Sequence, residues 1–513
     1  MSRKTDFKTV FANLRLVYIT LYMLLIAFVS TIPLRRLIEG KSAVIYSIVA
    51  FFGCILLAVD FFTRRVIFKP KYCTVLILFI ISCIISSIYN IKYGFMSNVK
   101  AIIWGCIQFF LIVGVDTELP LETTKKHLKT LTEIFSFFWF VCVVISFYQF
   151  IVQYSRTWHF PSQFRPAHEG FFEGRLHGIF SDPNYASLCS IFVIFFCIIN
   201  FKGSVFNKIY HILNLSAQFF YIVLSGSRTS LLCFIISLCL FSWILVWNKL
   251  EAMGMENLRK ISGSLIACAV CVLLIISTSH LIKTFSVSTV KLYQNSINHT
   301  QNGDIISDNS DVDDSEISLD RPDVSQNSDV SNGRTSIWKD YLKVFAKSPI
   351  FGTSPRNAMS FAKDHFDSLF IIERNYSVHN TYLAILVYTG ILGTAILVVW
   401  AIGTLFEIAG YIIRRRKTQD EHYFTVVVLT MILTVCAVAA FPSLFIFFDN
   451  STPDIIFWIS LGYTKAFIRI SEPERYKKET LSYRITQKIM PNSKKQSTSK
   501  GYPLYTKSNL DLF

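Results

Sequence analysis

Residues 218–247 read "QFFYIVLSGSRTSLLCFIISLCLFSWILVW", in which two apolar runs flank the polar segment 225–230. The second run, residues 231–247, carries no charged residue. Apolar runs of about 18 residues are long enough to cross the hydrocarbon core of a bilayer as an α-helix. This stretch therefore predicts a membrane span that begins immediately after Arg228, and it poses the question of what a guanidinium does at that entrance.

The composition of the whole chain agrees with a membrane protein. Of its 513 residues, 52% are hydrophobic and only 16% are charged, and the mean hydropathy is +0.45. Soluble domains usually carry about 25% charged residues. Runs such as "LILFIISCIISSI", residues 76–88, do not alternate between apolar and polar residues as the strands of a membrane barrel do. The sequence therefore predicts an all-α integral membrane protein, because helices satisfy their backbone hydrogen bonds internally.

Twelve apolar runs are predicted to span the membrane. They cover residues 15–33, 43–62, 73–89, 99–115, 131–153, 185–201, 210–225, 229–247, 262–282, 380–406, 423–448 and 453–468. The first run is predicted to stay in the protein, since no small-residue cleavage site follows it. With twelve spans, the two termini lie on the same side.

The distribution of positive charge predicts which side that is. The net charge is +16, and Lys and Arg concentrate in the loops on the N-terminal side and in the tail 469–513. Cytoplasmic loops are enriched in Lys and Arg, so both termini are predicted to be cytoplasmic. One loop, residues 35–41, is basic on the opposite side and does not fit. We interpret the excess charge as a topology signal and an attraction to anionic lipids rather than as a nucleic-acid site.

This topology leaves two large extracytoplasmic loops, at about 154–184 and 283–379. The second contains the acidic tract 302–329, with nine acidic residues and one Arg, which predicts a disordered insertion. A calcium-binding loop is the alternative, but the central glycine that such loops require is missing. Residues 333–352 predict an amphipathic helix at the membrane surface, with Trp338, Leu342 and Phe345 on one face, and residues 357–372 predict a second helix.

Several charged or titratable residues converge on the extracytoplasmic face. They occur in "EGRLHGIFSDPNYAS" (173–187), "SGSR" (225–228), "NGRTSIW" (332–338) and "RNYSVHNTYL" (374–383), and they are Arg175, His177, Asp182, Arg228, Arg334, Arg374 and His379. Each has a structural alternative. Asp182 followed by Pro183 predicts a helix cap, and an Arg at the end of a span can reach toward lipid headgroups.

Together these residues predict a site for a lipid-linked diphosphate. The planar guanidinium group binds phosphate oxygens in pairs, and a lipid diphosphate presents its charge at this depth. A histidine can take a proton from a sugar hydroxyl at neutral pH. A glycosyl transfer outside the cell needs a lipid-linked donor, and Arg can then stabilise the leaving diphosphate in place of a metal ion.

The order "GRLHGIFSDPN", "SGSR", "GRTSIWKDYLKVFAKSPIFGTSP", "HNTYLAILVYTGILGT" resembles the O-antigen ligase and Wzy-type polysaccharide polymerase superfamily over residues 170–400. The resemblance implies a metal-independent glycosyltransferase of the GT-C kind in the bacterial cytoplasmic membrane, without cofactors. It implies that Arg175 and Arg228 bind the diphosphate and that His379 is the base. Substrate-binding roles are predicted for Arg334, His177, Asn184, Trp338 and Asn380.

Alternatives remain at this stage. Arg156 and Arg165 share a loop with Arg175, and His177 competes with His379 as the base. The predicted function is polymerisation of polyprenyl-diphosphate-linked oligosaccharide units, which act as both donor and acceptor. One alternative is a ligase that moves finished glycan to lipid A core, wall polymer or protein, and another is a flippase or transporter for lipid-linked sugar. A repeat-unit flippase and a chain-length regulator are the predicted partners, with no nucleic acid.

Overall fold

The computed structural model describes residues 7–64, 73–115, 119–161, 166–301, 319, 333–414 and 450–472. Within these residues the chain is mostly helical, and seven helices are long and apolar enough to cross a membrane. The protein is therefore a multi-pass membrane protein with an all-α membrane part. The predicted span 423–448, most of the acidic tract 302–329 and most of the basic tail lie outside the described residues, so the count of twelve spans stays a prediction.

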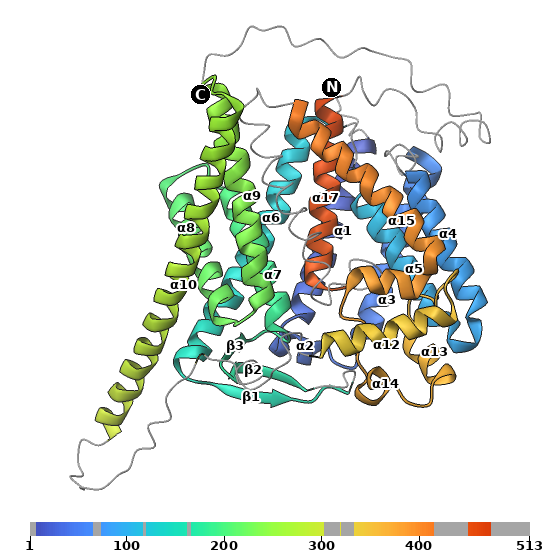
Figure 1. Ribbon diagram of the computed structural model, residues 1–513, viewed down its shortest axis with the longest axis horizontal. Helices are drawn as coiled ribbons and strands as arrows, with labels where there is room; N and C mark the ends of the chain where they lie inside the picture. Colours follow the sequence, from blue (N-terminus) through green and yellow to red (C-terminus); the bar gives the residue numbers. More distant parts are fainter. Residues whose placement is uncertain are drawn as a thin grey trace.

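The helices form a bundle whose long members run roughly side by side (Figure 1). Short π-helical segments, Asp60–Arg64 and Ile107–Ile112, continue two of the helices, and a 3₁₀ turn, Ile91–Tyr93, directly precedes the second of these helices. The helices are α1 (Phe7–Val29), α2 (Ile32–Ile38), α3 (Ser42–Val59), α4 (Cys73–Tyr89), α5 (Phe95–Cys106), α6 (Leu121–Ile151), α7 (Pro183–Ile199), α8 (Val205–Leu224), α9 (Arg228–Ala252), α10 (Asn257–Gln301), α12 (Arg334–Lys347), α13 (Ala358–His365), α14 (Phe370–Arg374), α15 (Thr381–Arg414) and α17 (Thr452–Ser471).

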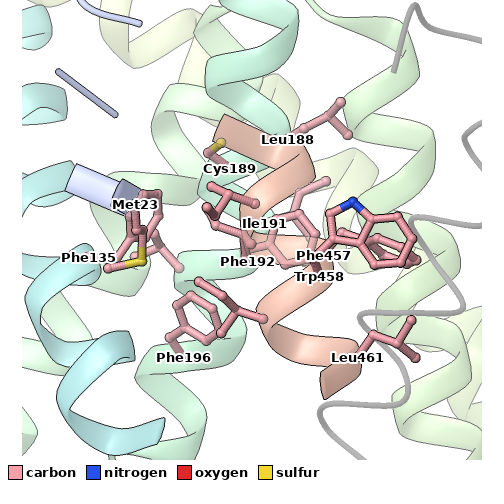
Figure 2. Packing of buried hydrophobic residues seen from close by; sticks show 14 of the residues in the cluster. Met23, Phe135, Leu188, Cys189, Ile191, Phe192, Phe196, Phe457, Trp458 and Leu461 are labelled. Atoms are coloured by element: carbon pink, nitrogen blue, oxygen red, sulfur yellow. The ribbon is translucent and has the colours of Figure 1, made fainter. Parts of the chain in front are cut away.

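The core of the bundle lies where α1, α6, α7 and α17 meet. Figure 2 shows Met23 of α1, Phe135 of α6, Phe192 of α7 and Trp458 of α17 packed in one apolar cluster. Helices α7 and α17 are surrounded by other helices, and nearly all of their residues are buried. A helix that is buried all round belongs at the centre of a large bundle.

One end of the bundle carries a small sheet together with α2, α12, α13 and α14 (Figure 1). The antiparallel strands β1 (Ser155–Trp158), β2 (Ala167–Phe172) and β3 (Arg175–Gly178) lie in that order, with an irregularity between Gly170 and Phe171. The sequence analysis placed 154–184 in a loop and did not predict the sheet. Helix α1 begins at the opposite end and finishes beside the sheet, so the predicted extracytoplasmic segments do lie at one common end.

Helix α15 is interrupted at Gly390, whose backbone has φ 64° and ψ −170°. The segment 349–354 fills the interruption. The N–H groups of Thr353 and Ser354 donate to the carbonyls of Val387 and Tyr388, at 2.8 and 2.9 Å, and the N–H of Ile391 donates to the carbonyl of Pro349 at 2.8 Å. The backbone groups that the kink removes from the helix therefore keep partners, as an irregular segment inside a membrane protein requires.

Two predicted helices differ in extent from the structure. The span predicted at 262–282 is part of α10, which has 45 residues and projects past the sheet (Figure 1). Helix α12 confirms the predicted helix, and it ends at Lys347, just before Pro349. However, α12 packs on its neighbours through Ile337, Tyr341 and Val344, while Leu342 of the predicted face is 48% exposed.

A group of buried charges joins α15 to α17. Lys465 lies 3.4 Å from Glu407, donates to the hydroxyl of Thr404 at 3.0 Å, and is followed one turn later by Arg469, 3.7 Å from the same carboxylate. Glu407 and Lys465 are at most 2% exposed. Because α17 begins toward the sheet end of the bundle and ends at the other end, this group is remote from the predicted site (Figure 1).

Candidate functional site

Arg175 at the start of β3 is held by two neighbours from other elements. Its Nε donates to the carbonyl of Ser225 at 2.9 Å, and its Nη2 donates to Oδ1 of Asn184 at 2.8 Å. Ser225 is the C-cap residue that directly follows α8, and Asn184 lies in the first turn of α7. The structure therefore brings "EGRLHG" and "SGSR" together, 50 residues apart in the chain.

The first turn of α7 is fixed by the predicted cap. The Asp182 carboxylate accepts from the N–H groups of Asn184 and Tyr185, at 2.7 and 3.4 Å, and Pro183 occupies the first helical position. This geometry confirms the cap that the "SDPN" pattern predicts. It also sets the position of Asn184, and through Asn184 it sets the guanidinium of Arg175.

A cluster of serine hydroxyls fixes the segment that carries Arg228. Ser227 caps α9 by accepting from the N–H of Ser230, and the hydroxyl of Ser230 lies 2.7 Å from that of Ser187 on α7. All three serines are buried. The first turns of α7 and α9 are thus tied together, so Arg228 begins α9 close to the carbonyl that holds Arg175.

Arg228 differs from Arg175 in its surroundings. Its side chain is exposed, and its guanidinium forms no hydrogen bond or ion pair with the residues that the structure describes. The first turns of two helices, α7 and α9, add partial positive charge at the same place. Asp182, directly before α7, is an acid of this region, and its carboxylate is already used by the cap. An anion is the ligand that this arrangement favours.

His177 lies two residues after Arg175 on β3, next to an aromatic group. Its ring meets those of His168 and Phe172 edge-on, with centroids 5.8 and 6.3 Å away, and the rings of His168 and Phe172 stack at 3.9 Å. Burial lowers the pKa of His168. The carbonyl of His177 accepts from the hydroxyl of Tyr221 at 3.1 Å. Among the two candidate bases, His177 is therefore the one joined by its strand to Arg175.

His379 belongs to a second group, built by α12, α14 and the start of α15. Its backbone is left-handed, with φ 49°, and its ring meets that of Tyr376 edge-on at 5.9 Å. The carbonyl of Tyr376 accepts from the hydroxyl of Tyr341 on α12 at 2.8 Å. The left-handed region is uncommon for residues other than glycine, and strained residues of this kind cluster at functional sites.

The other predicted residues of this second group have definite positions. Arg334 begins α12 and is partly buried, and Arg374, which ends α14, is exposed. The indole N–H of Trp338 is buried and has no hydrogen-bond partner among the described residues. The amide oxygen of Asn380 accepts from the N–H groups of Tyr382 and Leu383, at 3.0 and 3.1 Å, so this side chain caps α15.

The predicted residues thus fall into two groups at the same end of the bundle (Figure 1). Arg175 contacts Asn184 and Ser225 directly, and Arg228 follows Ser225 by three residues at the start of α9, while His379, Asn380, Arg334 and Trp338 lie on α12 and around the start of α15. Of the competing arginines, Arg156 lies on β1 and Arg165 lies outside the described residues. No group of three His, Cys, Asp or Glu side chains in the described part of the chain is arranged to hold a metal ion.

The sequence analysis missed the residues that position the arginines. Ser225 offers a backbone carbonyl, which no sequence pattern reveals. The Ser187–Ser230 contact also joins distant segments, although a serine shortly before an apolar run, as at Ser227, is a recognisable cap signal. The described cysteines are free.

Comparison with known proteins identifies part of the chain. Residues 212–398 match the model of the O-antigen ligase family. This region runs from α8 past the kink of α15 and includes Arg228, Arg334 and His379, whereas Arg175, His177 and Asn184 precede it. A search of the curated proteins found no match. The match supports a glycosyltransferase-like enzyme that acts on lipid-linked glycan, and it confirms the resemblance of this chain to the O-antigen ligase and Wzy-type polymerase superfamily.

Proposed function

We propose that the protein polymerises polyprenyl-diphosphate-linked oligosaccharide units into a capsular or extracellular polysaccharide on the outer face of the cytoplasmic membrane. The observation that carries this proposal is the fixed guanidinium of Arg175, which binds the carbonyl of Ser225, three residues before the exposed Arg228 that begins α9. Two fork-shaped cations at the first turns of two helices suit the two phosphates of a lipid diphosphate. The family match supports a lipid-linked glycan as the substrate.

The reaction follows from these roles. A hydroxyl of the acceptor sugar attacks the anomeric carbon of the donor, and the bond from that carbon to the diphosphate oxygen breaks. The proton of the hydroxyl passes to a histidine, for which His379 is our first candidate and His177 the alternative. Arg175 and Arg228 stabilise the charge that develops on the departing lipid diphosphate. Attack opposite the leaving group inverts the anomeric configuration.

Three further predicted residues support this arrangement. Asn184 orients Arg175, so its role is to position a cation that binds substrate. The buried indole N–H of Trp338 needs an acceptor, and a sugar hydroxyl would supply one. Arg334 begins the same helix and is proposed to bind the glycan or to dock α12.

The activity for which the matched family is named, O-antigen ligation, favours one second candidate. In that case the acceptor would be lipid A core, wall polymer or protein instead of another lipid-linked unit. The two reactions give different products, because a polymerase builds a ladder on the lipid carrier from a single purified substrate, whereas a ligase needs a separate acceptor.

The experiment uses the full chain, reconstituted in proteoliposomes with one purified lipid-linked unit. We expect a ladder of products and one polyprenyl diphosphate released for each new bond. Arg228→Lys should lower the rate at least tenfold, because a point charge cannot replace the bidentate fork. Arg259→Lys, an exposed substitution in the first turn of α10, is the matched control and should elongate at the parental rate.

Each result has a definite consequence. An Arg228→Lys protein that elongates at the parental rate would refute the diphosphate role of Arg228. Absence of a ladder, together with transfer to an added non-lipid acceptor, would replace the polymerase by the ligase.

A further inference from the structure

The basic loop at 35–41, which does not fit the predicted charge distribution, packs against the sheet. The guanidinium of Arg36, in the last turn of α2, lies 3.8 Å from the ring centroid of Trp158. That of Arg156 on β1 lies 3.9 Å from the same centroid, and that of Arg35 lies 4.5 Å from the ring of Phe160. We call Arg35, Arg36 and Arg156 the α2 cation cluster.

The ring that gathers these cations is itself held rigidly. The indole N–H of Trp158 donates to Oε2 of Glu169 at 2.6 Å, and Oε1 of Glu169 accepts from the side-chain amide of Gln149 at 2.9 Å. Glu169 is 5% exposed. Its carboxylate is therefore occupied by two N–H donors behind the ring. Neither Arg36 nor Arg156 forms an ion pair with any residue that the structure describes.

The cluster is attached to the diphosphate site by a short backbone link. The N–H of Ile32 donates to the carbonyl of Ile179 at 2.7 Å, and the N–H of Ser181 donates to the carbonyl of Ser30 at 2.9 Å. Ser181 directly precedes Asp182, the residue that caps α7 and thereby positions Asn184. Arg156 and Arg175 thus lie on the two edge strands of one three-stranded sheet, Arg156 on β1 and Arg175 on β3.

Arg36 and Arg156 bring two positive charges to this ring, and Glu169, which is bound to the N–H of the ring, supplies one negative charge, so the group keeps a net positive charge. The guanidinium carbons of Arg36 and Arg156 lie over the ring, and a guanidinium in that position can still donate its N–H groups to phosphate oxygens. Glu39, the C-cap residue of α2, is the acid near Arg35, and it is exposed. Leu37 of α2 is 76% exposed. An exposed leucine beside these cations suits the boundary between acyl chains and headgroups.

We propose that the α2 cation cluster is a second diphosphate site, which binds the lipid-linked acceptor while Arg175 and Arg228 bind the donor. The proposal rests on the proposed function and deepens it. A polymerase must hold two lipid diphosphates at once, and only the donor loses its diphosphate. The acceptor site therefore has to bind a lipid diphosphate without activating it as a leaving group. This fits cations that are fixed by an aromatic ring and lie on the far side of the sheet from Arg175.

The first experiment counts sites. The full chain is placed in nanodiscs of uncharged phosphatidylcholine and titrated with polyprenyl diphosphate that carries no sugar. We expect two bound molecules for each parental chain and one for the double variant Arg36→Gln/Arg156→Gln. Lys41→Gln, which removes a charge from the same loop without touching an aromatic ring, should retain two.

The matched double variant Arg175→Gln/Arg228→Gln should also retain one. Two molecules on Arg36→Gln/Arg156→Gln would overturn the second site and leave the proposed function intact. Two molecules on Arg175→Gln/Arg228→Gln would instead overturn the donor site. Phosphatidylglycerol, added at equal concentration, should leave the number of bound polyprenyl diphosphate molecules unchanged. A loss of one bound diphosphate would show that the cluster binds lipid headgroups in general, and it would overturn the acceptor assignment.

A kinetic measurement separates binding from a structural role. Arg36→Gln/Arg156→Gln should raise the KM for the acceptor at least tenfold and leave the KM for the donor unchanged. Arg36→Lys/Arg156→Lys keeps the charge and should restore part of the affinity. A lowered kcat with an unchanged acceptor KM, at an unchanged unfolding midpoint, would contradict the proposal.

Discussion

Replacing Asn184 by alanine tests whether the orientation of Arg175 matters for turnover. The substitution removes the amide oxygen that accepts from Nη2 of Arg175, at 2.8 Å. It leaves the backbone of α7 unchanged, because the cap uses the N–H of Asn184 and the carboxylate of Asp182. The hydrogen bond from Arg175 to the carbonyl of Ser225 also remains.

The size of the effect follows from the kind of bond that is lost. A hydrogen bond to a charged group contributes about 1.5–3 kcal/mol. Since about 1.4 kcal/mol corresponds to a tenfold change in rate, full loss of this bond would lower the rate roughly ten- to a hundredfold. Arg175 is partly exposed and keeps its second partner. We therefore expect the lower end of this range, about a tenfold loss.

The assay is the elongation rate in proteoliposomes, with the unfolding midpoint measured on the same preparations. Asn207→Ala is the matched control, because Asn207 lies in the first turn of α8 and its amide nitrogen donates to the backbone carbonyls of Asn200 and Lys202. This control should elongate at the parental rate. Arg175→Ala should lose more activity than Asn184→Ala.

Combining the two substitutions supplies the decisive result. If Asn184 acts through Arg175, the double variant Asn184→Ala/Arg175→Ala should be no slower than Arg175→Ala by more than about twofold, because the two residues form one unit. Losses that multiply would mean that Asn184 has a separate role. A parental rate for Asn184→Ala would refute the reasoning that positions Arg175 in the reaction.

Three further predictions concern other parts of the molecule. His379→Ala should lower kcat more than it weakens binding of the lipid-linked donor, measured by single-turnover kinetics, and equal losses would make His379 a binding residue. Gly352→Ala should lower the unfolding midpoint far more than Gly254→Ala does. Both glycines have φ near +71°, but only at Gly352 does the added methyl group meet the backbone at Gly390, as close as 2.5 Å. Similar midpoints for the two variants would contradict the packing of the kink. Glu407→Gln should destabilise the protein by about 3–5 kcal/mol because it leaves the charge of Lys465 buried without its carboxylate partner. Adding Lys465→Met should recover part of that loss. A double variant as unstable as the single one would argue against the ion pair.

The features that depend on neighbours in the chain could be predicted. Asp182 and Pro183 cap α7 because a cap is decided within a few residues. The end of α12 before Pro349 follows for the same reason. Arg175 and Arg228 were correctly placed at one end of the bundle, since apolar runs of known length alternate the ends at which loops emerge.

The features that depend on distant contacts could not be predicted from the sequence. The contact between Arg175 and Ser225 joins residues 50 positions apart, through a carbonyl that every residue possesses. The strands β1 and β3 have four residues each, too few for a clear alternation. The polar residues after Ile282 end the hydropathy signal, yet α10 continues, because helix formation outside the membrane does not need an apolar sequence. The packing face of α12 was missed because its apolar residues lie on two sides, and only the neighbours decide which side is buried.

The interlocked kink at Gly390 has a mechanical consequence. Because the strap 349–354 joins α12 to the half-helix that starts after His379, these parts cannot shift independently without giving up several backbone hydrogen bonds. A bulky glycan that displaces α12 will therefore also move the imidazole of His379. Discrimination among saccharides of different size would then show itself in turnover rather than in affinity alone.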